Sequence, residues 1–239
     1  MKPIAVFQHT EVGAPGAVVP ILKEQGRRVH LVRIFEGEPV PLKATDFGGL
    51  IFMGGYMGVH DDFPWIAQEL SLIRNAAARG IPLAGHCLGS QMLALALGGS
   101  VARHTAPEIG WQALQTEDSQ VARNWWGEFA GNEVQTFQWH ADTFQPPPRA
   151  VLIAKSLHCP NQAFILDGRH LLLQSHLEMT PDLVELSMER NGHQLIRQHA
   201  LGNPAISNPD DLTRDLQART AQMRLILTRL YTRWVQGCG

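Results

Sequence analysis

The sequence predicts an α/β protein built on a doubly wound, mostly parallel central sheet that is flanked by helices. Short runs rich in Val, Ile, Leu and Phe recur between helix-like stretches, at residues 4–7, 29–34, 50–53, 81–84 and 171–174. Their almost continuous apolarity is typical of strands that are covered on both faces, as in a parallel sheet. Glycine-rich segments follow the runs at 50–53 and 81–84. In such a sheet, loops at the carboxyl ends of strands are where ligands bind.

The middle of the chain predicts small antiparallel additions to this sheet. Residues 101–164 combine short strand-like segments, such as 111–116 and 134–139, with the loop Pro146-Pro147-Pro148. No linker divides the chain, and a length of 239 residues suits one large α/β domain. We therefore expect a single domain over residues 1–200.

Two helices are expected to close the chain. Thr180 and Asn208, each followed by proline, are typical N-caps, and the second helix is predicted to run to about Gln236. Apolar residues recur along it every three or four positions, which indicates one packed face. Residues 201–239 are therefore expected to form a helical extension packed on the same domain.

Composition narrows the class of function. Hydrophobic residues make up 44% of the chain, but no apolar run approaches the roughly 20 residues needed to span a bilayer, and the first residues lack the features of a signal peptide. A net charge of −2 gives no general attraction to nucleic acids or anionic membranes. The chain has three cysteines, an odd number that does not suggest a disulfide framework. We expect a cytoplasmic protein with a small-molecule substrate, and neither nucleic acid nor membrane as a partner.

The most informative segment surrounds Cys87. An apolar strand leads to this cysteine, a helix-forming run leaves it, and Gly85 and Gly89 stand two residues to either side. Glycines at these positions let a strand reverse tightly into a helix, which presents the residue at the turn. A thiol at a helix N-terminus is favoured as the thiolate, which suits covalent catalysis. The same pattern also fits a buried cysteine at an ordinary strand-to-helix turn.

Gln91 makes this pattern more specific. Residues 85–91 read Gly-His-Cys-Leu-Gly-Ser-Gln, which resembles the nucleophile motif Gly-x-Cys-x-Gly-x-Gln of class I glutamine amidotransferases. The resemblance extends over roughly residues 4–180 and is to stand-alone members that are similar to the amidotransferase domain of GMP synthase. It implies a flavodoxin-like fold, a γ-glutamyl thioester on Cys87, and a role for Gln91 in holding the amino-acid end of the substrate.

A histidine and a glutamate later in the chain match the other members of such a site. A nucleophilic cysteine needs a histidine to exchange its proton and a third group to align the imidazole. His176 and Glu178 follow the run at 171–174, and residues two apart on an extended chain share a face. The pair resembles the family's His-Pro-Glu, with Leu177 in place of proline. By itself, a His-x-Glu pair in a chain with 11 histidines and 22 acidic residues also fits a structural role.

A glycine-rich loop is predicted to supply an oxyanion hole. Gly54, Gly55 and Tyr56 follow an apolar run and resemble the family's Gly-Gly-Pro loop, with Tyr56 in place of proline. We expect the backbone amides of Gly55 and Leu88 to stabilise the tetrahedral intermediate, typically by a few kcal/mol. Gly54 and Tyr56 are expected to line the substrate pocket. An ordinary glycine turn has the same pattern, whereas a phosphate loop is disfavoured because no Gly-Lys-Ser/Thr follows.

Two further segments match stand-alone family members. Residues 107–111 read Pro-Glu-Ile-Gly-Trp, and residues 137–142 read Phe-Gln-Trp-His-Ala-Asp, which resembles Trp-His-Gly-Asp. The resemblance implies that both segments line the glutamine cleft. It also implies that the backbone around Trp139 and His140 contacts the amino-acid end of the substrate. The residues by themselves equally suit a hydrogen bond within the loop.

The resemblance implies an amide-hydrolysing enzyme. Thiolate attack on the γ-carboxamide of glutamine would release ammonia protonated by His176, and water activated by the same imidazole would then hydrolyse the thioester. No metal and no organic cofactor is expected. Two kinds of enzyme fit: a glutaminase that feeds a separate synthetase subunit, and a stand-alone γ-glutamyl peptidase or hydrolase. The helices after Thr180 favour the stand-alone kind.

Two other classes stay open on the sequence. The related intracellular peptidase and deglycase group shares the flavodoxin-like sheet and the cysteine turn, but there a carboxylate from an early strand accompanies the cysteine. Gln91, His176 and Glu178 favour the amidotransferase interpretation over this group. A non-catalytic ligand sensor or regulatory subunit would keep the fold without activity, and the presence of the whole Cys, His and Glu set argues against it.

Overall fold

One nine-stranded sheet forms the centre of the computed structural model, which describes residues 1–239. The strand order is β2-β1-β3-β4-β9-β8-β7-β5-β6. Five parallel strands form one half: β1 (Ile4–Gln8), β2 (Val29–Arg33), β3 (Gly49–Phe52), β4 (Leu83–His86) and β9 (His170–Leu173). The order 2-1-3-4 is that of a doubly wound, flavodoxin-like sheet, as the sequence predicts.

The other half of the sheet is antiparallel. It comprises β5 (Ser100–Thr116), β6 (Glu133–Gln145), β7 (Val151–Ser156) and β8 (Ala163–Leu166), and β8 joins it to β9. The predicted additions are present but larger than expected. β5 and β6 pair with each other along almost their whole length, with a register shift between Arg103 and Glu108.

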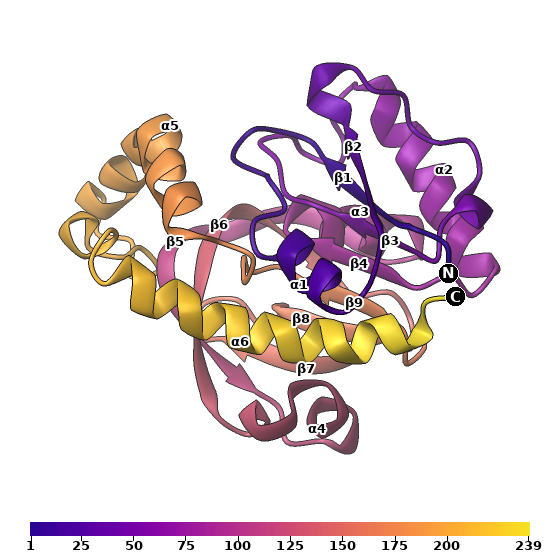
Figure 1. Cartoon of the computed structure of the whole chain (residues 1–239). Helices are drawn as coiled ribbons and strands as arrows, with labels where there is room; N and C mark the ends of the chain where they lie inside the picture. The colour runs from indigo at the N-terminus through magenta and orange to yellow at the C-terminus, as the bar shows by residue number, and fades with distance from the viewer.

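Helices cover both faces of the sheet (Figure 1). On one face, α1 (Val18–Glu24), α4 (Gln120–Trp126) and α6 (Leu216–Trp234) share a continuous apolar core with the strands. On the other face, α2 (Pro64–Ala78) and α3 (Leu88–Ala96) pack in a second core. α5 (Pro181–Ala200) lies to one side, near β5 and β6. Short 3-10 turns span Ile34–Glu36, Ala44–Asp46, Gly127–Phe129, Pro209–Asp211 and Val235–Gly237.

The last helix packs through its apolar stripe but is shorter than predicted. Met223, Leu227 and Leu230 on α6 are fully buried, and the helix lies against α1 and α4. Asn208 does cap a turn, yet only a 3-10 turn follows it, and the α-helix begins at Leu216. The helix does not form earlier because Asp215 has a left-handed backbone conformation, with φ at 54°. The proposed division of the chain near residue 200 stays a prediction.

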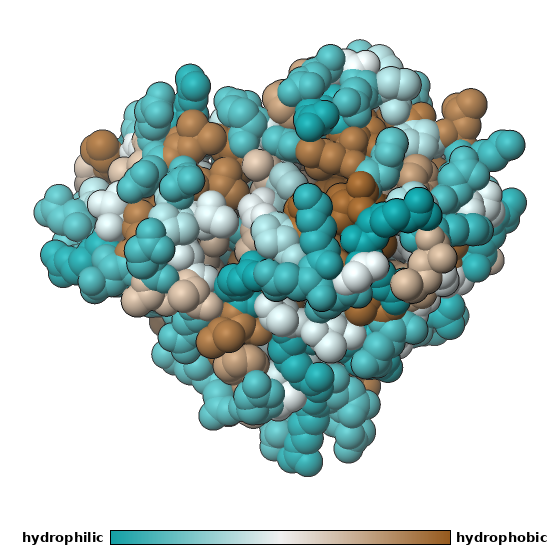
Figure 2. All heavy atoms as spheres, viewed as in Figure 1, coloured by the Kyte–Doolittle hydropathy of each residue, from teal (hydrophilic) through white to brown (hydrophobic).

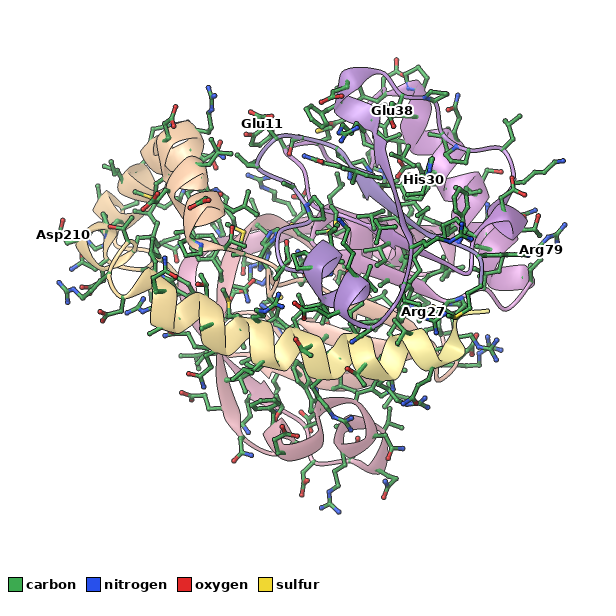
Figure 3. All side chains as sticks on the ribbon, in the orientation of Figure 1. Glu11, Arg27, His30, Glu38, Arg79 and Asp210 are labelled. Atoms are coloured by element: carbon green, nitrogen blue, oxygen red, sulfur yellow. The ribbon has the colours of Figure 1, made fainter.

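The outer surface carries most of the charge. Figure 2 shows that the face viewed in Figure 1 is covered mainly by hydrophilic residues, with hydrophobic ones in separate groups. Charged side chains such as Arg79 and Asp210 point away from the sheet at opposite sides of the molecule (Figure 3). None of the helices combines the length and the apolarity that a membrane crossing requires.

Glycine lets α3 approach the sheet closely at the turn that carries Cys87. A Cβ atom on Gly89 would overlap the carbonyl group of Phe52 in β3, and one on Gly85 would lie 2.5 Å from the amide nitrogen of Ser90. Backbone atoms cannot yield as flexible side chains can. The two glycines that flank Cys87 are therefore required by packing, which places the start of α3 directly over the ends of β3 and β4.

We predict that Gly89→Ala destabilises the protein by about 1–3 kcal/mol or more, the typical cost of overpacking. The measurement is urea unfolding followed by circular dichroism. Gly192→Ala in α5 is the control, because its Cβ would meet only the flexible end of Met188, at 3.3 Å. That change should be neutral or stabilising by up to about 1 kcal/mol, the helix propensity difference. Equal destabilisation by both variants would contradict the packing argument.

Candidate active site

Cys87 occupies a strained turn between β4 and α3. Its backbone has φ 49° and ψ −110°, a left-handed conformation that costs a residue other than glycine about 1–3 kcal/mol. Hydrogen bonds hold the turn in place. The N–H of Cys87 donates to the carbonyl of Leu173 over 2.8 Å, and the Ser90 hydroxyl accepts from the N–H of Leu173 over 2.7 Å. The cysteine is only 6% exposed, and its Sγ lies 3.9 Å from the carbonyl oxygen of Trp139.

His176 lies beside this cysteine, just after β9. The backbone N–H of His176 donates to the carbonyl of Phe137 in β6 over 2.8 Å, which holds the backbone in place. In the side chain, Nδ1 lies 2.7 Å from Oε1 of Glu178. A Cβ atom on Gly54 would lie 3.0 Å from Cε1 of His176 and 3.7 Å from Cβ of Cys87. The structure therefore brings the predicted Cys87, His176 and Glu178 into one row, with Gly54 facing the gap between thiol and imidazole.

The electrostatics of this row favour a charged imidazole. Burial alone would lower the pKa of His176, but the charges of Glu178 and Cys87 and hydrogen bonds to both raise it well above the usual range. Burial alone would likewise raise the pKa of Glu178, but His86 and His176 lower it far below the usual range. Glu178 is therefore ionised at neutral pH. Its negative charge stabilises the imidazolium that a thiolate at Cys87 requires.

Glu178 has a second histidine partner that the sequence analysis did not assign. Nδ1 of His86, at the end of β4, lies 2.8 Å from Oε2 of Glu178, and Nε2 of His86 lies 2.9 Å from the hydroxyl oxygen of Tyr231 in α6. All three side chains are almost completely buried. His86 occupies a variable position of the nucleophile motif, so the motif assigns it no role. Tyr231 carries no local signal at all.

The predicted oxyanion loop lies directly across from the start of α3. A Cβ atom on Gly55 would lie 3.0 Å from Cδ2 of Leu88, so the two residues are adjacent. The amide of Gly55 makes no hydrogen bond within the protein, and Leu88 is the first residue of α3, where helix amides lack an intrahelical acceptor. Tyr56 is 51% exposed, and its hydroxyl donates to Glu11 over 3.2 Å. Figure 3 shows Glu11 on the loop that follows β1.

A buried hydrogen bond between a histidine and a glutamate supports this loop from beneath. Nδ1 of His9 lies 3.0 Å from the carbonyl oxygen of Met53, and its Nε2 lies 3.0 Å from a carboxylate oxygen of Glu69 in α2. Both ring nitrogens face acceptors, so the ring donates on both sides when it carries two protons. The side chains of His9 and Glu69 are fully buried. The sequence analysis left this histidine without a role, because its partner lies 60 residues away.

The predicted substrate-binding residues meet on the opposite side of Cys87. Gln91 is 4% exposed, and its Nε2 donates to the carbonyl of Asp142 over 3.3 Å and to Oε1 of Gln174 over 3.2 Å. Trp139 is partly exposed in the cleft. The side chain of His140 turns inward instead, so only its backbone can serve a ligand: Nδ1 lies 2.9 Å from the Asp142 carbonyl and Nε2 lies 2.9 Å from Oε2 of Glu108.

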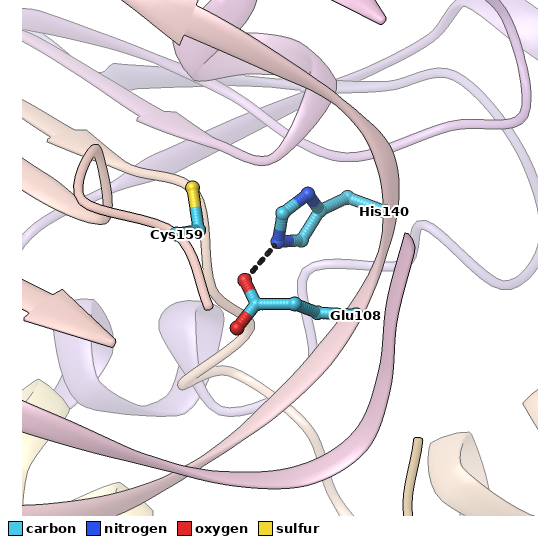
Figure 4. A group of neighbouring side chains, drawn as sticks. All are labelled: Glu108, His140 and Cys159. Atoms are coloured by element: carbon cyan, nitrogen blue, oxygen red, sulfur yellow. Dashed lines mark hydrogen bonds and ion pairs between the residues drawn. The ribbon is translucent and has the colours of Figure 1, made fainter. Parts of the chain in front are cut away.

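Glu108, His140 and Cys159 form a buried cluster whose ligand-type atoms lie within 4.8 Å of one another (Figure 4). Hydrogen bonds already use the carboxylate, which accepts from His140, from the Ser156 hydroxyl at 2.6 Å and from the Gln162 amide at 2.6 Å. Burial raises the pKa of Cys159, which disfavours the thiolate that metals bind. We interpret the cluster as a hydrogen-bonded support for the part of β6 that carries Trp139.

Two connected pockets lie on either side of Cys87. The larger has a volume of about 580 Å³ and extends past Gln91 to the polar face of α5. It includes two cations that the sequence analysis missed, Arg103 and Arg197. The smaller pocket lies on the side of His176, and its apolar wall includes Val12, Phe137, Trp139 and Met179. Of the predicted segment 107–111, only Pro107 and Ile109 reach the larger pocket, and Trp111 is buried with its Nε1 donating to Leu212.

Comparisons with known proteins identify the family of this chain. The family described as glutamine amidotransferase class-I matches residues 16–195, and the chain belongs to this family. A crystal structure of a glutamine amidotransferase from Methylobacillus flagellatus has a TM-score of 0.95 and 34% identity, covering 100% of this chain and 96% of that one. The glutamine amidotransferase-like protein YfeJ of Salmonella typhimurium is 26% identical over 192 residues, 78% of this chain and 80% of YfeJ.

Other relatives represent both kinds of enzyme that the sequence left open. Gamma-glutamyl peptidase 4 of Arabidopsis thaliana is 24% identical over 181 residues, which cover 74% of this chain and 72% of the peptidase. The glutamine-hydrolysing GMP synthase of Lactobacillus acidophilus is 31% identical over 142 residues, 58% of this chain but only 26% of the synthase. The family and these relatives support amide hydrolysis as the chemistry.

We predict that protonation of Glu178 destabilises the fold in acid. Because the pKa of Glu178 is lower in the folded state than in the unfolded chain, at about 4.3, its contribution is complete above that pH and is lost as the pH falls toward the folded value. The free energy of unfolding, measured in urea between pH 3 and 7, should therefore fall below pH ~4.5. Glu178→Gln should flatten this decline, and Glu185→Gln on the exposed face of α5 is the matched control. A decline as steep in Glu178→Gln as in the parent protein would contradict the assignment.

Proposed function

We propose that the protein hydrolyses the γ-amide bond of glutamine or of a γ-glutamyl compound, with Cys87 as nucleophile, His176 as general acid and base, and Glu178 as the group that aligns His176. One observation carries the proposal: the imidazole of His176 interacts with the thiol on one side and with the carboxylate on the other. Family membership supplies the class of reaction.

In the first half of the proposed reaction, the thiolate of Cys87 attacks the γ-carbonyl carbon and forms a C–S bond. The carbonyl oxygen becomes an oxyanion, which the amides of Gly55 and Leu88 stabilise. The intermediate then expels the nitrogen as its C–N bond breaks. His176 donates its proton to that nitrogen, so ammonia or an amine leaves and a γ-glutamyl thioester remains.

In the second half, water replaces the departed amine beside His176. The neutral imidazole now accepts a proton from this water, whose oxygen attacks the thioester carbon. Collapse of the second tetrahedral intermediate breaks the C–S bond, and the sulfur leaves as the thiolate. Glutamate is released, and Cys87 and His176 are again a thiolate and an imidazolium, as they were before the reaction.

The two pockets suggest how the substrate lies across Cys87. His176 must stand next to the leaving nitrogen, so the amine belongs in the smaller pocket and the glutamyl group in the larger one. There, Gln91 and the backbone at Trp139 and His140 would contact the amino-acid end. Arg103 and the side chain of Asp142, which lie 3.3 Å apart, offer a cation for the α-carboxylate and an anion for the α-ammonium group.

The smaller pocket, where the leaving amine would lie, favours a stand-alone γ-glutamyl hydrolase over a glutaminase subunit. The apolar wall of the smaller pocket would bury an alkyl or aryl substituent on the amine, which ammonia lacks. Likeness to the amidotransferase part of a GMP synthase supports the other form, in which a separate synthetase subunit takes up the ammonia. The three free thiols favour a cytoplasmic location in either case.

We predict that Cys87→Ser lowers kcat for release of glutamate from glutamine or γ-glutamyl substrates by at least about 10⁴-fold, as for loss of other catalytic nucleophiles. Glutamate release is measured by a coupled glutamate dehydrogenase assay, and intact mass with a diazo-oxo-norleucine probe tests for a covalent adduct. Cys238→Ser, the same change at a thiol near the C-terminus, should retain activity and the adduct. Undiminished turnover by Cys87→Ser would overturn the nucleophile assignment.

We also predict that the enzyme favours γ-glutamyl amides with apolar amines. In the series of γ-glutamyl methyl-, ethyl- and propylamide, kcat/KM should rise by up to about fourfold per methylene, equivalent to about 0.8 kcal/mol for each buried CH₂. Val12→Ser should reduce this gradient, because it makes the wall of the smaller pocket more polar. A flat or falling series, with glutamine as the best substrate, would favour the synthetase-coupled form instead.

A further inference from the structure

A continuous chain of hydrogen bonds extends from the proposed site to the C-terminal helix. It starts at His176, passes through the carboxylate of Glu178 to His86, and ends at the hydroxyl of Tyr231 in α6, with heavy-atom distances of 2.7, 2.8 and 2.9 Å. The rings of His86 and Tyr231 lie nearly parallel, at an interplanar angle of 9°. The two outer members, His86 and Tyr231, have no part in the reaction proposed above.

The protons along this chain can be assigned from the available partners. The hydroxyl of Tyr231 has one hydrogen-bond partner, Nε2 of His86, so its proton is satisfied only if Nε2 accepts it. Burial, with smaller effects of Glu178 and Cys238, raises the pKa of Tyr231 well above its usual range, so the hydroxyl keeps its proton. Nε2 of His86 is then the acceptor of this hydrogen bond, and the proton on Nδ1 donates to Glu178.

We propose that His86 and Tyr231 are positioning residues for catalysis: Tyr231 selects the Nδ1–H tautomer of His86, and this N–H holds Glu178 in the orientation that aligns His176. The inference rests on the catalytic roles proposed for Cys87, His176 and Glu178. It assigns a function to the C-terminal helix, which supplies a polar anchor beneath the site.

The surroundings of Glu178 leave it no other means of alignment. The residue is 2% exposed, so water does not compete for its oxygens. The titratable groups that face the row come from four places: His86 at the end of β4, Cys87 at the following turn, His176 after β9, and Tyr231 in α6, with Cys238 beyond it. With His86 as donor, both carboxylate oxygens have a partner. Without it, Oε2 would be buried and unpaired, and the carboxylate could change the angle at which Oε1 meets Nδ1 of His176 while staying in contact with it.

The hydrogen bond from His86 to Glu178 also influences the pKa of His176. A donor at Oε2 partly neutralises Glu178, so the carboxylate binds the proton of His176 less tightly. Removing that donor should raise the pKa of His176 and make its imidazolium a weaker acid toward the leaving amine. The expected signature is a lower kcat with an unchanged KM, and an alkaline limb of the kcat/KM profile that moves to higher pH.

His86→Leu and His86→Asn separate a positioning role from simple packing. Leucine removes the donor, and kcat should fall roughly tenfold, less than the ~100-fold loss that a full ångström of misplacement causes. Asparagine places an amide N–H where Nδ1 stood, so kcat and the alkaline limb should return close to those of the parent protein. If the two variants behave alike, or if His86→Leu is as active as the parent, the proposal is overturned.

Tyr231→Phe tests the outer link, with Trp234→Phe as a matched control. Both changes remove one buried hydrogen bond from α6, since Nε1 of Trp234 donates to the carbonyl of Leu83 over 3.0 Å, and both should lower the melting temperature. Only Tyr231→Phe should lower kcat and shift the alkaline limb in the direction of His86→Leu. Equal kinetics for the two variants at a temperature where both are folded would contradict the role of Tyr231.

The tautomer of His86 can be measured without any turnover. Nitrogen-15 NMR of histidine-labelled protein should show a neutral Nδ1–H imidazole for His86 in the parent protein, assigned by its loss in His86→Asn, and a changed tautomer or protonation state in Tyr231→Phe. A doubly protonated or Nε2–H ring in the parent would overturn the proposal. Full activity of Cys87→Ser would instead refute the proposed function and leave this measurement unaffected, so the two failures are distinguishable.

Discussion

The structure depends on one buried carboxylate. Glu178 is ionised in the interior, where an unpaired charge is costly, and it is stable there only because His176 and His86 donate to its two oxygens. Its backbone is held as well, since the N–H of Ala17, just before α1, donates to the Glu178 carbonyl over 2.9 Å. Through Tyr231 the same network reaches α6. Elements from the first to the last helix therefore meet at a single residue.

Two similar pairs support the rest of the cleft. His9 and Glu69 lie beneath the glycine loop, and His140 and Glu108 lie beside Trp139 in the paired strands β6 and β5. Buried ion pairs contribute little net stability, because desolvation offsets much of the attraction. Their role here is geometric: each pair fixes a backbone segment that, in the proposed reaction, would contact the substrate or the oxyanion. The proposed cleft is thus preorganised by side chains behind its lining.

The arrangement of the two pockets suggests one orientation for the substrate of the proposed reaction. In the proposed reaction, the glutamyl group would lie on the polar side, against Gln91 and α5, and the leaving amine would lie on the apolar side, beside His176 and Met179. Cys87 stands where the two pockets join, at the carboxyl edge of the parallel strands. This is where a doubly wound sheet places its ligands, because the loops after neighbouring strands converge there.

The parallel half of the sheet, the turn at Cys87 and the pairing of His176 with Glu178 could be predicted from the sequence. Each depends on neighbours in the chain: continuous apolar runs, glycines two residues from the cysteine, and a two-residue spacing on an extended backbone. Where local signals were ambiguous, the prediction was wrong, as for the helix after Asn208, which starts only at Leu216.

The partners of the buried polar groups could not be predicted, because they depend on how distant parts of the chain pack. His86 meets Tyr231 across 145 residues and His9 meets Glu69 across 60, and nothing in the sequence near either histidine indicates its partner. Local sequence sets backbone preferences, but a buried proton is satisfied by whatever acceptor the packed chain brings within about 3 Å. That choice is made by strand order and helix packing, which place distant residues side by side.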